Sequence, residues 1–369
     1  MKIICKKTDL AKGVGIVAKA VPAKSSMPIL ECILIDASQK AITLTANDME
    51  LGIETKVEGD IVEAGIVALN ARIFSEIVRK LPDSDITIDT DANYQTSITC
   101  ERAKFNIAAQ SGETFPRLPD VGKEEYFTVS EFDLREAIRQ TIFSTAGGEA
   151  NKMMSGELFD VHDNVLKVVS LDGHRISIRK IRLEDAYISR MAVVPGKALM
   201  EISKILSGDP KADITISFTE NHISFELKKT VVVSRLIEGE YYKIDQMITS
   251  DYETKTRLSR AELQDCIDRA TLLVRENDKK PIVIKIQDDA MELKVKSQLG
   301  AWNEEISVNK EGKDLLIGFN PRFLMDALRV IDDEEVDVYF TNPKSPCLIK
   351  DAETYTYLIL PVNLPSSAA

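Results

Sequence analysis

Apolar and polar positions alternate with a helical period in three segments that lie 125 residues apart along the chain. They read 72-RIFSEIVRKL-81, 197-KALMEISKIL-206 and 322-RFLMDALRVI-331. Each begins with a basic residue and carries another seven residues later, and their apolar residues recur at matching places. A fixed long period of this kind indicates one domain copied three times, so the function is sought in what the copies do together.

A second set of amphipathic helices is predicted near the start of each copy. Apolar residues follow helical spacing in the segments 9–21, 131–142 and 260–273. The pairs Ser130 with Asp133 and Ser259 with Glu262 have the spacing of an N-terminal cap. These pairs indicate where the second and third of these helices begin.

Strand patterns follow each predicted helix. A period of two predicts strand pairs at 33–48, 157–172 and 283–298, and further strands at 85–90, 213–219 and 335–341. The order helix, strands, helix, strands predicts an α+β fold in which each domain packs two helices on antiparallel sheet. We place the three domains at residues 1–121, 126–249 and 252–369, with polar linkers between them.

The basic positions of the repeated helix point away from its apolar face. At 100° per residue, residues seven apart share a direction, and the apolar positions lie about 140–200° from it. Each helix also carries an acid four residues after its first base, at Glu76, Glu201 and Asp326. Ion pairs of this spacing are common on solvated helices and contribute a few tenths of a kcal/mol. The basic stripe therefore fits either a plain solvated face or a surface for an anion.

Charge is divided unevenly along the chain. Its 369 residues have a formal net charge of −12, whereas the six helical segments together carry about +3. If the helices lie on one side, that side is electropositive and the remaining surface is acidic. A surface of this kind binds phosphates without reading bases.

The remaining composition favours a cytoplasmic protein that needs no metal or cofactor. Cys5, Cys32, Cys100, Cys266 and Cys347 lie far apart and form no CxxC, which predicts reduced thiols. The first residues, MKIICKKTDL, lack the apolar stretch of a signal peptide. No apolar run approaches the roughly 18 residues that a membrane span needs.

One segment, 170-SLDGHRIS-177, has the composition of a catalytic site. Its Asp172 and His174 follow a predicted strand and resemble a general acid–base pair or part of a metal site. The alternative is a tight Asp-Gly turn between two strands, with Arg175 in solvent. The sequence has no P-loop, no GxGxxG after a strand, no GxSxG and no HExxH. We expect a binding protein, with an enzyme centred on Asp172 and His174 as the alternative.

Five short motifs connect the chain with a known family: 28-PIL-30, 172-DGHR-175, 193-VVPGK-197, 236-LIEGEY-241 and 355-YTYLILPVNL-364. With them, and over essentially its whole length, the sequence resembles the bacterial sliding clamp, the β subunit of DNA polymerase III. The resemblance implies a DNA-clamp fold, with three repeated domains per chain and a head-to-tail homodimeric ring around double-stranded DNA. It implies a non-catalytic processivity factor that serves a DNA-directed DNA polymerase, a nucleotidyltransferase, in DNA replication.

Candidate site residues fall into three groups. For DNA, the basic stripes supply Arg72, Arg79, Lys80, Lys197, Lys204, Arg322 and Arg329, and the resemblance adds Lys24 and Lys152. For short linear motifs of the polymerase, the clamp loader and repair proteins, the resemblance implies an apolar pocket of Met154, Leu171, Gly173, His174, Arg175, Ile176, Tyr242, Met247, Leu358, Ile359, Leu360, Pro361 and Val362. For ring closure, it pairs Phe105 and Ile107 with Leu272 and Leu273 of the other subunit.

Three residues depart from the family pattern at the rim of this pocket. Tyr242 replaces a proline, and Gln246 and Asn363 replace arginines, so the preferred peptide sequence stays open. A third class of function also stays open, a peptide-binding scaffold that never meets DNA. Nicked circular and linear DNA would retain such a scaffold equally, whereas a clamp stays on the circle and slides off free ends.

Overall fold

The structure of the protein is a computed structural model that describes residues 1–147, 151–248, 251–274, 280–351 and 354–364. The last five residues of the third predicted domain, 365–369, lie outside the described residues. The chain divides into two compact units. Unit 1 comprises Met1–Phe132 and Glu201–Leu236, and unit 2 comprises Asp133–Met200 and Ile237–Ala369.

Six α-helices lie in the described residues, at the six places where the apolar pattern predicts them. They are α1 (Lys7–Val17), α2 (Ala71–Lys80), α3 (Glu131–Thr141), α4 (Gly196–Ser203), α5 (Arg260–Thr271) and α6 (Pro321–Leu328). The Ser259 side chain accepts a hydrogen bond from the Glu262 amide, so the predicted cap of α5 is confirmed. Asn70 and Asn320 cap α2 and α6 in the same way.

Unit 1 contains one antiparallel sheet of thirteen strands. Its order is β10 (Glu125–Ser130), β13 (Asp213–Phe218), β14 (His222–Glu226), β15 (Thr230–Arg235), β4 (Leu51–Val57), β3 (Ile42–Asn47), β2 (Cys32–Asp36), β6 (Ile66–Asn70), β9 (Ala103–Ser111), β8 (Gln95–Cys100), β7 (Asp85–Thr90), β1 (Lys2–Lys6) and β5 (Asp60–Glu63). The pairing of β15 with β4 joins strands from the first and second predicted domains, and a 2.7 Å hydrogen bond links the Thr55 and Thr230 hydroxyls there.

Unit 2 contains a sheet of seven strands and a sheet of four. The first runs β11 (Gly156–Leu171), β12 (Arg175–Pro195), β24 (Tyr355–Ile359), β23 (Cys347–Asp351), β22 (Glu335–Phe340), β16 (Thr254–Ser259) and β20 (Asn309–Gly312). The second runs β19 (Ala301–Ser307), β18 (Ala290–Lys296), β17 (Ile282–Gln287) and β21 (Leu315–Phe319). The β12–β24 pairing, from Arg175↔Ile359 to Arg179↔Tyr355, joins the second and third predicted domains.

One strand prediction is wrong. Residues 157–172 were expected to form two strands, as 33–48 and 283–298 do, but they form the single strand β11. The polar residues His162 and Asp163 interrupt the alternation, and Asp163 has a positive φ of 52°. The neighbouring β12 shifts register at the same place, so the ladder continues through the irregularity as it does through a β-bulge.

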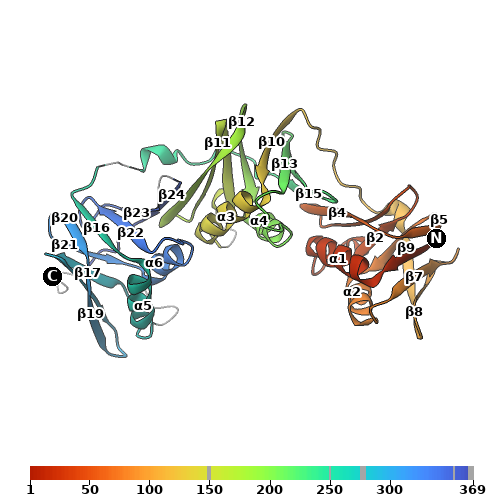
Figure 1. Cartoon of the computed structure of the whole chain (residues 1–369), viewed down its shortest axis with the longest axis horizontal. Helices are drawn as coiled ribbons and strands as arrows, with labels where there is room; N and C mark the ends of the chain where they lie inside the picture. The colour runs from red at the N-terminus through yellow and green to blue at the C-terminus, as the bar shows by residue number, and fades with distance from the viewer. Residues whose placement is uncertain (148–150, 249–250, 275–279, 352–353, 365–369) are drawn as a thin grey trace. The chain divides into compact units, whose positions relative to one another are not determined.

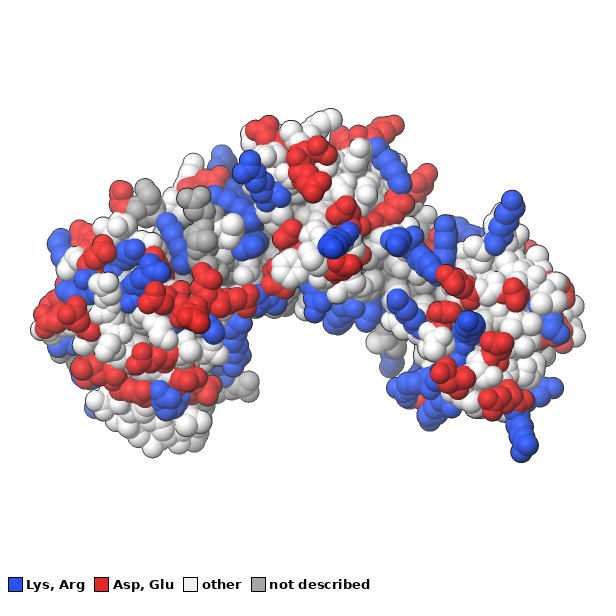
Figure 2. Space-filling model, in the orientation of Figure 1, with Lys and Arg blue, Asp and Glu red and all other residues white. Residues whose placement is uncertain are grey.

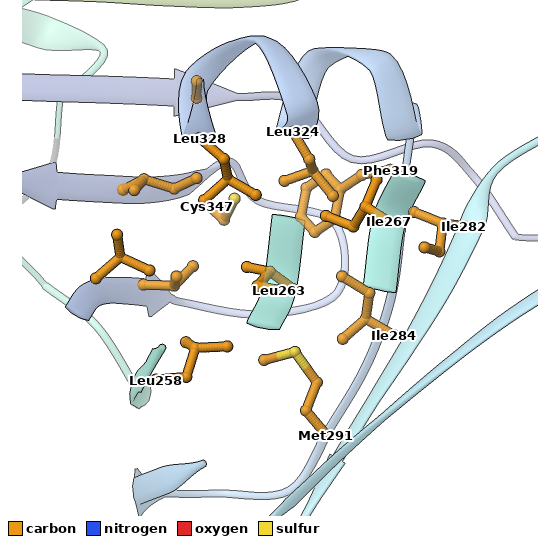
Figure 3. Close-up of a cluster of buried hydrophobic side chains, with 14 of the residues drawn as sticks. Leu258, Leu263, Ile267, Ile282, Ile284, Met291, Phe319, Leu324, Leu328 and Cys347 are labelled. Carbon is orange, nitrogen blue, oxygen red and sulfur yellow. The ribbon is translucent and has the colours of Figure 1, made fainter. Parts of the chain in front are cut away.

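In unit 2, helices α5 and α6 pack their apolar faces against the sheets in one buried core. Leu324 and Leu328 point from α6 into a core that contains Phe319, Ile267 and Cys347 (Figure 3). Complete burial of a side chain of this size stabilises the fold by about 1.5–3 kcal/mol. In unit 1, α1 packs on α2 and β4 in a similar way (Figure 1). The opposite faces of these helices remain available for other contacts.

The five cysteines are buried and free, as predicted. Burial raises the pKa of the Cys5 and Cys266 thiols to about 12, which keeps both protonated near neutral pH. In the described part of the chain, no helix is long and apolar enough to cross a membrane.

Candidate functional site

The nine residues predicted to contact DNA are all exposed. In unit 1, α2 buries Phe74 and Ile77 and turns Arg72 and Arg79 to solvent. A group of basic side chains is visible at the position of this helix (Figure 2). The burial pattern therefore agrees with the predicted direction of the stripe.

The acids of the repeated helices bond partners that their spacing did not suggest. Glu76 lies four residues after Arg72, yet its ion pairs are with Arg79 at 2.6 Å and Lys80 at 3.8 Å. Glu201 bonds Lys204 at 2.7 Å. All three ion pairs are local, and Arg79, Lys80 and Lys204 are exposed, so the basic groups stay accessible to an anion.

The third acid, Asp326, bonds an arginine from a distant part of unit 2. Arg175 donates a 2.6 Å hydrogen bond from Nη1 to Asp326 Oδ2. Asp326 also lines a cleft between α5 and α6. The other residues that line this cleft are Asp268, Thr271, Val274, Pro321, Met325 and the two candidate DNA-binding residues Arg322 and Arg329.

Two candidate lysines lie outside the three repeated helical segments of the sequence. Lys24 is exposed in the loop before η2 (Pro28–Glu31), and Lys152 is exposed in η5 (Lys152–Ser155). A second cleft, in unit 1, brings Arg72, Glu76 and Lys80 together with Phe105 and Ile107. The charged face of α2 thus adjoins the residues predicted for ring closure.

The turn 172–175 connects β11 and β12, as the non-catalytic alternative predicts. Gly173 has φ +87°, and Asp172 Oδ1 accepts hydrogen bonds from the His174 and Arg175 amides at 3.0 and 3.2 Å. Asp172 Oδ2 accepts from Arg175 Nε at 2.9 Å. The carboxylate is occupied within the turn, which leaves His174 without an acid–base partnership to it.

The expectation that Arg175 lies in solvent is wrong, because only 9% of its side chain is exposed. Its Nη2 donates to the Phe143 carbonyl at 2.6 Å, and its guanidinium lies 4.4 Å from the centre of the Phe323 ring. Burial opposes its charge, but contacts with Tyr357, Asp326 and Asp172 raise the pKa of Arg175 above its ordinary value. The cation is therefore fixed in place.

Most residues predicted for the peptide pocket surround one apolar cluster in unit 2. Leu171, Ile176 and Leu358 are buried in it, and Met154 and Tyr242 pack against it half-buried. Gly173 and His174 are exposed beside the cluster, and Pro361 and Val362 are half-buried after β24. Leu360 is exposed, and its amide donates to the His174 carbonyl at 2.8 Å.

A cleft at this cluster has Met247 and Leu358 among its walls. Sequence reasoning missed its other lining residues, Asp251, Tyr252, Tyr339, Thr341, Pro346, Leu348 and Lys350. It also missed Ile244 and Tyr241, although Tyr241 ends the motif 236-LIEGEY-241. Ile359 lies in a different cluster from the other predicted pocket residue of β24. The strand alternation of β24 turns it into the core of Figure 3, away from the cluster that holds Leu358.

The residues predicted for ring closure lie on a sheet edge in unit 1 and at the end of α5, beside a sheet edge, in unit 2. In unit 1, Phe105 is 39% exposed, and β9 pairs with β8 over residues 103–108 and with β6 only over 109–111. In unit 2, Leu272 is 79% exposed at the end of α5, and Leu273 packs half-buried against the core. The nearby β19 pairs only with β18 among the described strands. Among the described strands, both units thus present a sheet edge that has no partner strand.

No group of three or more His, Cys, Asp or Glu residues that could hold a metal occurs in the described residues. The candidate surfaces are the basic helix faces, the apolar pocket and the two sheet edges.

Comparison with known proteins matches the chain to three parts of one family. The part described as the DNA polymerase III beta subunit, N-terminal domain, matches residues 1–119. The central and C-terminal domains of that subunit match residues 128–243 and 245–363. The beta sliding clamp of Staphylococcus aureus is 35% identical over 357 residues, 94% of each chain. That of Staphylococcus epidermidis is 34% identical over the same share.

Solved structures agree with this assignment over the whole chain. A putative DNA polymerase III beta subunit from Eubacterium rectale is 60% identical with a TM-score of 0.96, covering 99% of this chain and 100% of that one. The DNA polymerase sliding clamp of Bacillus subtilis is 33% identical with a TM-score of 0.95, at the same coverage. The chain therefore belongs to the DNA polymerase III beta subunit family, the beta sliding clamps.

Proposed function

We propose that this protein is a sliding clamp that gives a replicative DNA polymerase its processivity. Two copies join head to tail, close around duplex DNA and hold the polymerase on its template in the cytoplasm. The clamp performs no chemical step, and the holoenzyme that it serves is the nucleotidyltransferase. The observation that carries the proposal is the match of all three family domains to a chain with exposed bases at equivalent positions of α2, α4 and α6.

DNA contact is electrostatic and independent of base sequence. The contact residues are Lys24, Arg72, Arg79, Lys80, Lys152, Lys197, Lys204, Arg322 and Arg329, all exposed. Lysine and arginine bind phosphates by releasing counterions, which makes binding sensitive to salt but not to sequence. Local ion pairs such as Glu76–Arg79 moderate this attraction. A closed ring needs no tight grip because topology keeps it on the DNA, so moderate attraction suits sliding.

Partner proteins bind through short segments with apolar anchors. The cluster around Leu171, Ile176 and Leu358 supplies a buried apolar floor, and Met154 and Met247 supply flexible walls. At the rim, His174 supplies an exposed polar side chain and Leu360 an exposed apolar one. A few apolar anchors in a desolvated pocket carry most of the energy of such an interface. The polymerase, the clamp loader and repair proteins would then compete for the same pocket.

Ring closure joins the free edge of β9 in one subunit to the β19 edge region of the other. Phe105 and Ile107 would meet Leu272 and Leu273, which buries the most exposed apolar side chains at both edges. Charges at the edges are complementary, because Lys104 is exposed on β9 and Glu305 on β19. Strand addition at an open edge satisfies backbone groups and gives a directional, head-to-tail contact.

The three domains are proposed to span residues 1–121, 126–249 and 252–369. The family matches at 1–119 and 128–243 support the first two, and the third match begins earlier, at residue 245. An enzyme centred on Asp172 and His174 receives no support from the geometry, because the Asp172 carboxylate is bonded to the turn and to Arg175.

Retention on circular and linear DNA tests the proposal. Labelled protein is loaded onto nicked circular plasmid with a clamp loader, and half of the sample is then linearised with a restriction enzyme. A sliding ring stays on the circle during gel filtration and leaves the linear DNA within the separation time. Equal retention on both forms would favour the peptide-binding scaffold over the clamp, and it would overturn the ring.

A further inference from the structure

We propose that Asp326 is a positioning residue for the peptide pocket and that, through Arg175, it couples this pocket to the DNA-facing surface of α6. The inference rests on the proposed function of both surfaces. It predicts positive coupling, so that DNA bound at α6 strengthens peptide binding and bound peptide strengthens DNA binding equally.

The first observation is the different behaviour of three equivalent acids. Glu76, Glu201 and Asp326 occupy the same position in the repeated helix. Glu76 and Glu201 bond basic residues that follow them by three or four positions in sequence. Asp326 instead bonds Arg175, which lies 151 residues away in sequence. In the third copy, the carboxylate at this position therefore makes a long-range contact within unit 2, whereas in the first two copies it makes a local pair.

The second observation is that Arg175 is held from several sides. Its guanidinium donates to Asp326 Oδ2, Asp172 Oδ2 and the Phe143 carbonyl at 2.6, 2.9 and 2.6 Å. The planar fork of arginine suits a set of acceptors in fixed directions. A lost carboxylate leaves part of a buried cation unsatisfied, which is costly. The position of Arg175 therefore depends on Asp326.

The third observation connects Arg175 with the pocket. It begins β12, and the next residue, Ile176, lies in the apolar cluster. The preceding residue, His174, stacks on Phe323 of α6 with ring centres 6.1 Å apart, and its carbonyl accepts the Leu360 amide. Helix α6 thus holds the turn at two points, by Phe323 under the imidazole and by Asp326 on the guanidinium.

The fourth observation places Asp326 on the DNA side as well. Its carboxylate lines the same cleft as Arg322 and Arg329, and its side chain is 31% exposed. A DNA phosphate between these arginines would repel the Asp326 carboxylate and favour the orientation that bonds Arg175. Phosphate binding would therefore hold the turn in the geometry of the structure. This is the physical origin of the positive sign of the coupling.

The test uses Asp326→Asn with Glu201→Gln as its matched control. Each change removes one negative charge from an equivalent helix position, so each should tighten binding of a short DNA duplex at low salt by a similar factor. Only Asp326→Asn removes the carboxylate from Arg175. A fluorescein-labelled peptide with leucine and phenylalanine anchors reports the pocket by anisotropy, with and without saturating duplex.

In the unchanged protein, the duplex should lower the peptide Kd about fivefold, and the peptide should lower the duplex Kd by the same factor, as linkage requires. In Asp326→Asn, the peptide Kd without DNA should rise about tenfold and the coupling factor should fall to about one. Glu201→Gln should keep both the peptide Kd and the coupling factor. Arg175→Lys, which keeps the charge but loses the fork, should resemble Asp326→Asn in its coupling.

Each other outcome has a distinct meaning. Coupling that persists in Asp326→Asn, or that is lost equally in Glu201→Gln, overturns the inference and points to general electrostatics. The inference is also overturned if peptide and duplex bind the unchanged protein independently of each other. An unchanged protein that binds neither probe contradicts the proposed function itself. Thermal unfolding of each variant separates a folded, uncoupled protein from a misfolded one, because a coupling factor is measured only on folded protein.

Discussion

At the scale of single residues, the most unusual group outside the proposed sites is the carboxyl of Glu157 in β11. The residue is completely buried, and both carboxyl oxygens lack a hydrogen-bond partner among the described residues. Burial raises the pKa of Glu157 to about 8, although Thr141 acts in the opposite direction. The Thr141 hydroxyl itself donates to the Ala137 carbonyl at 2.7 Å. Glu157 is therefore protonated in the folded protein at neutral pH.

This carboxyl should make the protein less stable as the pH rises. The unfolded chain releases the proton near pH 4.5, whereas the folded chain keeps it up to about pH 8. The contribution of this carboxyl to the free energy of unfolding is complete below pH 4.5 and is lost between pH 4.5 and 8. At 1.36 kcal/mol per pH unit, the loss is at most about 5 kcal/mol. Glu157→Gln carries no proton to lose, so urea unfolding should show a stability gain at pH 8 that shrinks toward pH 5. A gain of equal size at both values would contradict the shift.

Single residues also mark the limit of what the sequence could predict. The Asp-Gly turn at 172–175 was predictable because its chemistry is local. The burial of Arg175 was not, since its partner Asp326 lies 151 residues away and only the fold brings them together. The separation of Ile359 from Leu358 was not predictable for a related reason. Both faces of β24 are covered, so Leu358 and Ile359 are both apolar and the sequence does not distinguish pocket from core.

At the scale of elements, the helices were predictable because a buried face requires apolar residues at helical spacing, and this spacing is visible in the sequence. Each of the six begins within two residues of its predicted start, and each ends before its predicted end. Residues 157–172 were harder to predict. The polar interruption at Asp163 suggests a turn between two strands, but in the structure it is a bulge within the single strand β11. The joints β15–β4 and β12–β24 left no local signal, since strand pairing between distant segments depends on the assembled fold.

Charge reversal of the repeated helices should separate DNA contact from peptide binding. The combined change Arg72→Glu, Lys197→Glu and Arg322→Glu replaces the first base of each copy, all exposed. Each lost phosphate contact lowers the slope of log affinity against log salt by about 0.9, so the slope for a short duplex should fall by about 3 per subunit. Peptide affinity measured by anisotropy should change less than twofold, because the pocket cluster contains none of these residues.

The control for this experiment reverses three exposed lysines in turns between strands. Lys40, Lys228 and Lys344 each follow one strand of a pair and lie outside the predicted DNA contacts. Lys40→Glu, Lys228→Glu and Lys344→Glu together change the net charge by the same amount. If this variant lost as much of the salt slope as the helix variant, net charge would explain the effect and the helix faces would not.

At the scale of the whole molecule, the function depends on an interface that one chain cannot form alone. The edges of β9 and β19 are open among the described strands, and apolar side chains accompany both. An open edge is a site of association, and exposed leucine or phenylalanine beside it favours a specific partner over solvent. Two edges of different composition, one in each unit, fit a head-to-tail contact that closes after two copies.

Leu272→Asp should break the ring and with it the topological hold on DNA. Because Leu272 is 79% exposed, an aspartate there costs little folding energy in the monomer, but it would place an unpaired charge in the proposed interface. We expect sedimentation equilibrium to show a shift from dimer toward monomer, with thermal unfolding changed by only a few degrees. Ile188→Asp is the matched control, since Ile188 is 75% exposed on β12 and outside both edges, and this variant should remain a dimer.

The monomeric Leu272→Asp variant should still bind the peptide, yet it should wash off nicked circular DNA as fast as off linear DNA. A Leu272→Asp protein that stayed dimeric, or that stayed on the circle as a monomer, would show that Leu272 does not close the ring.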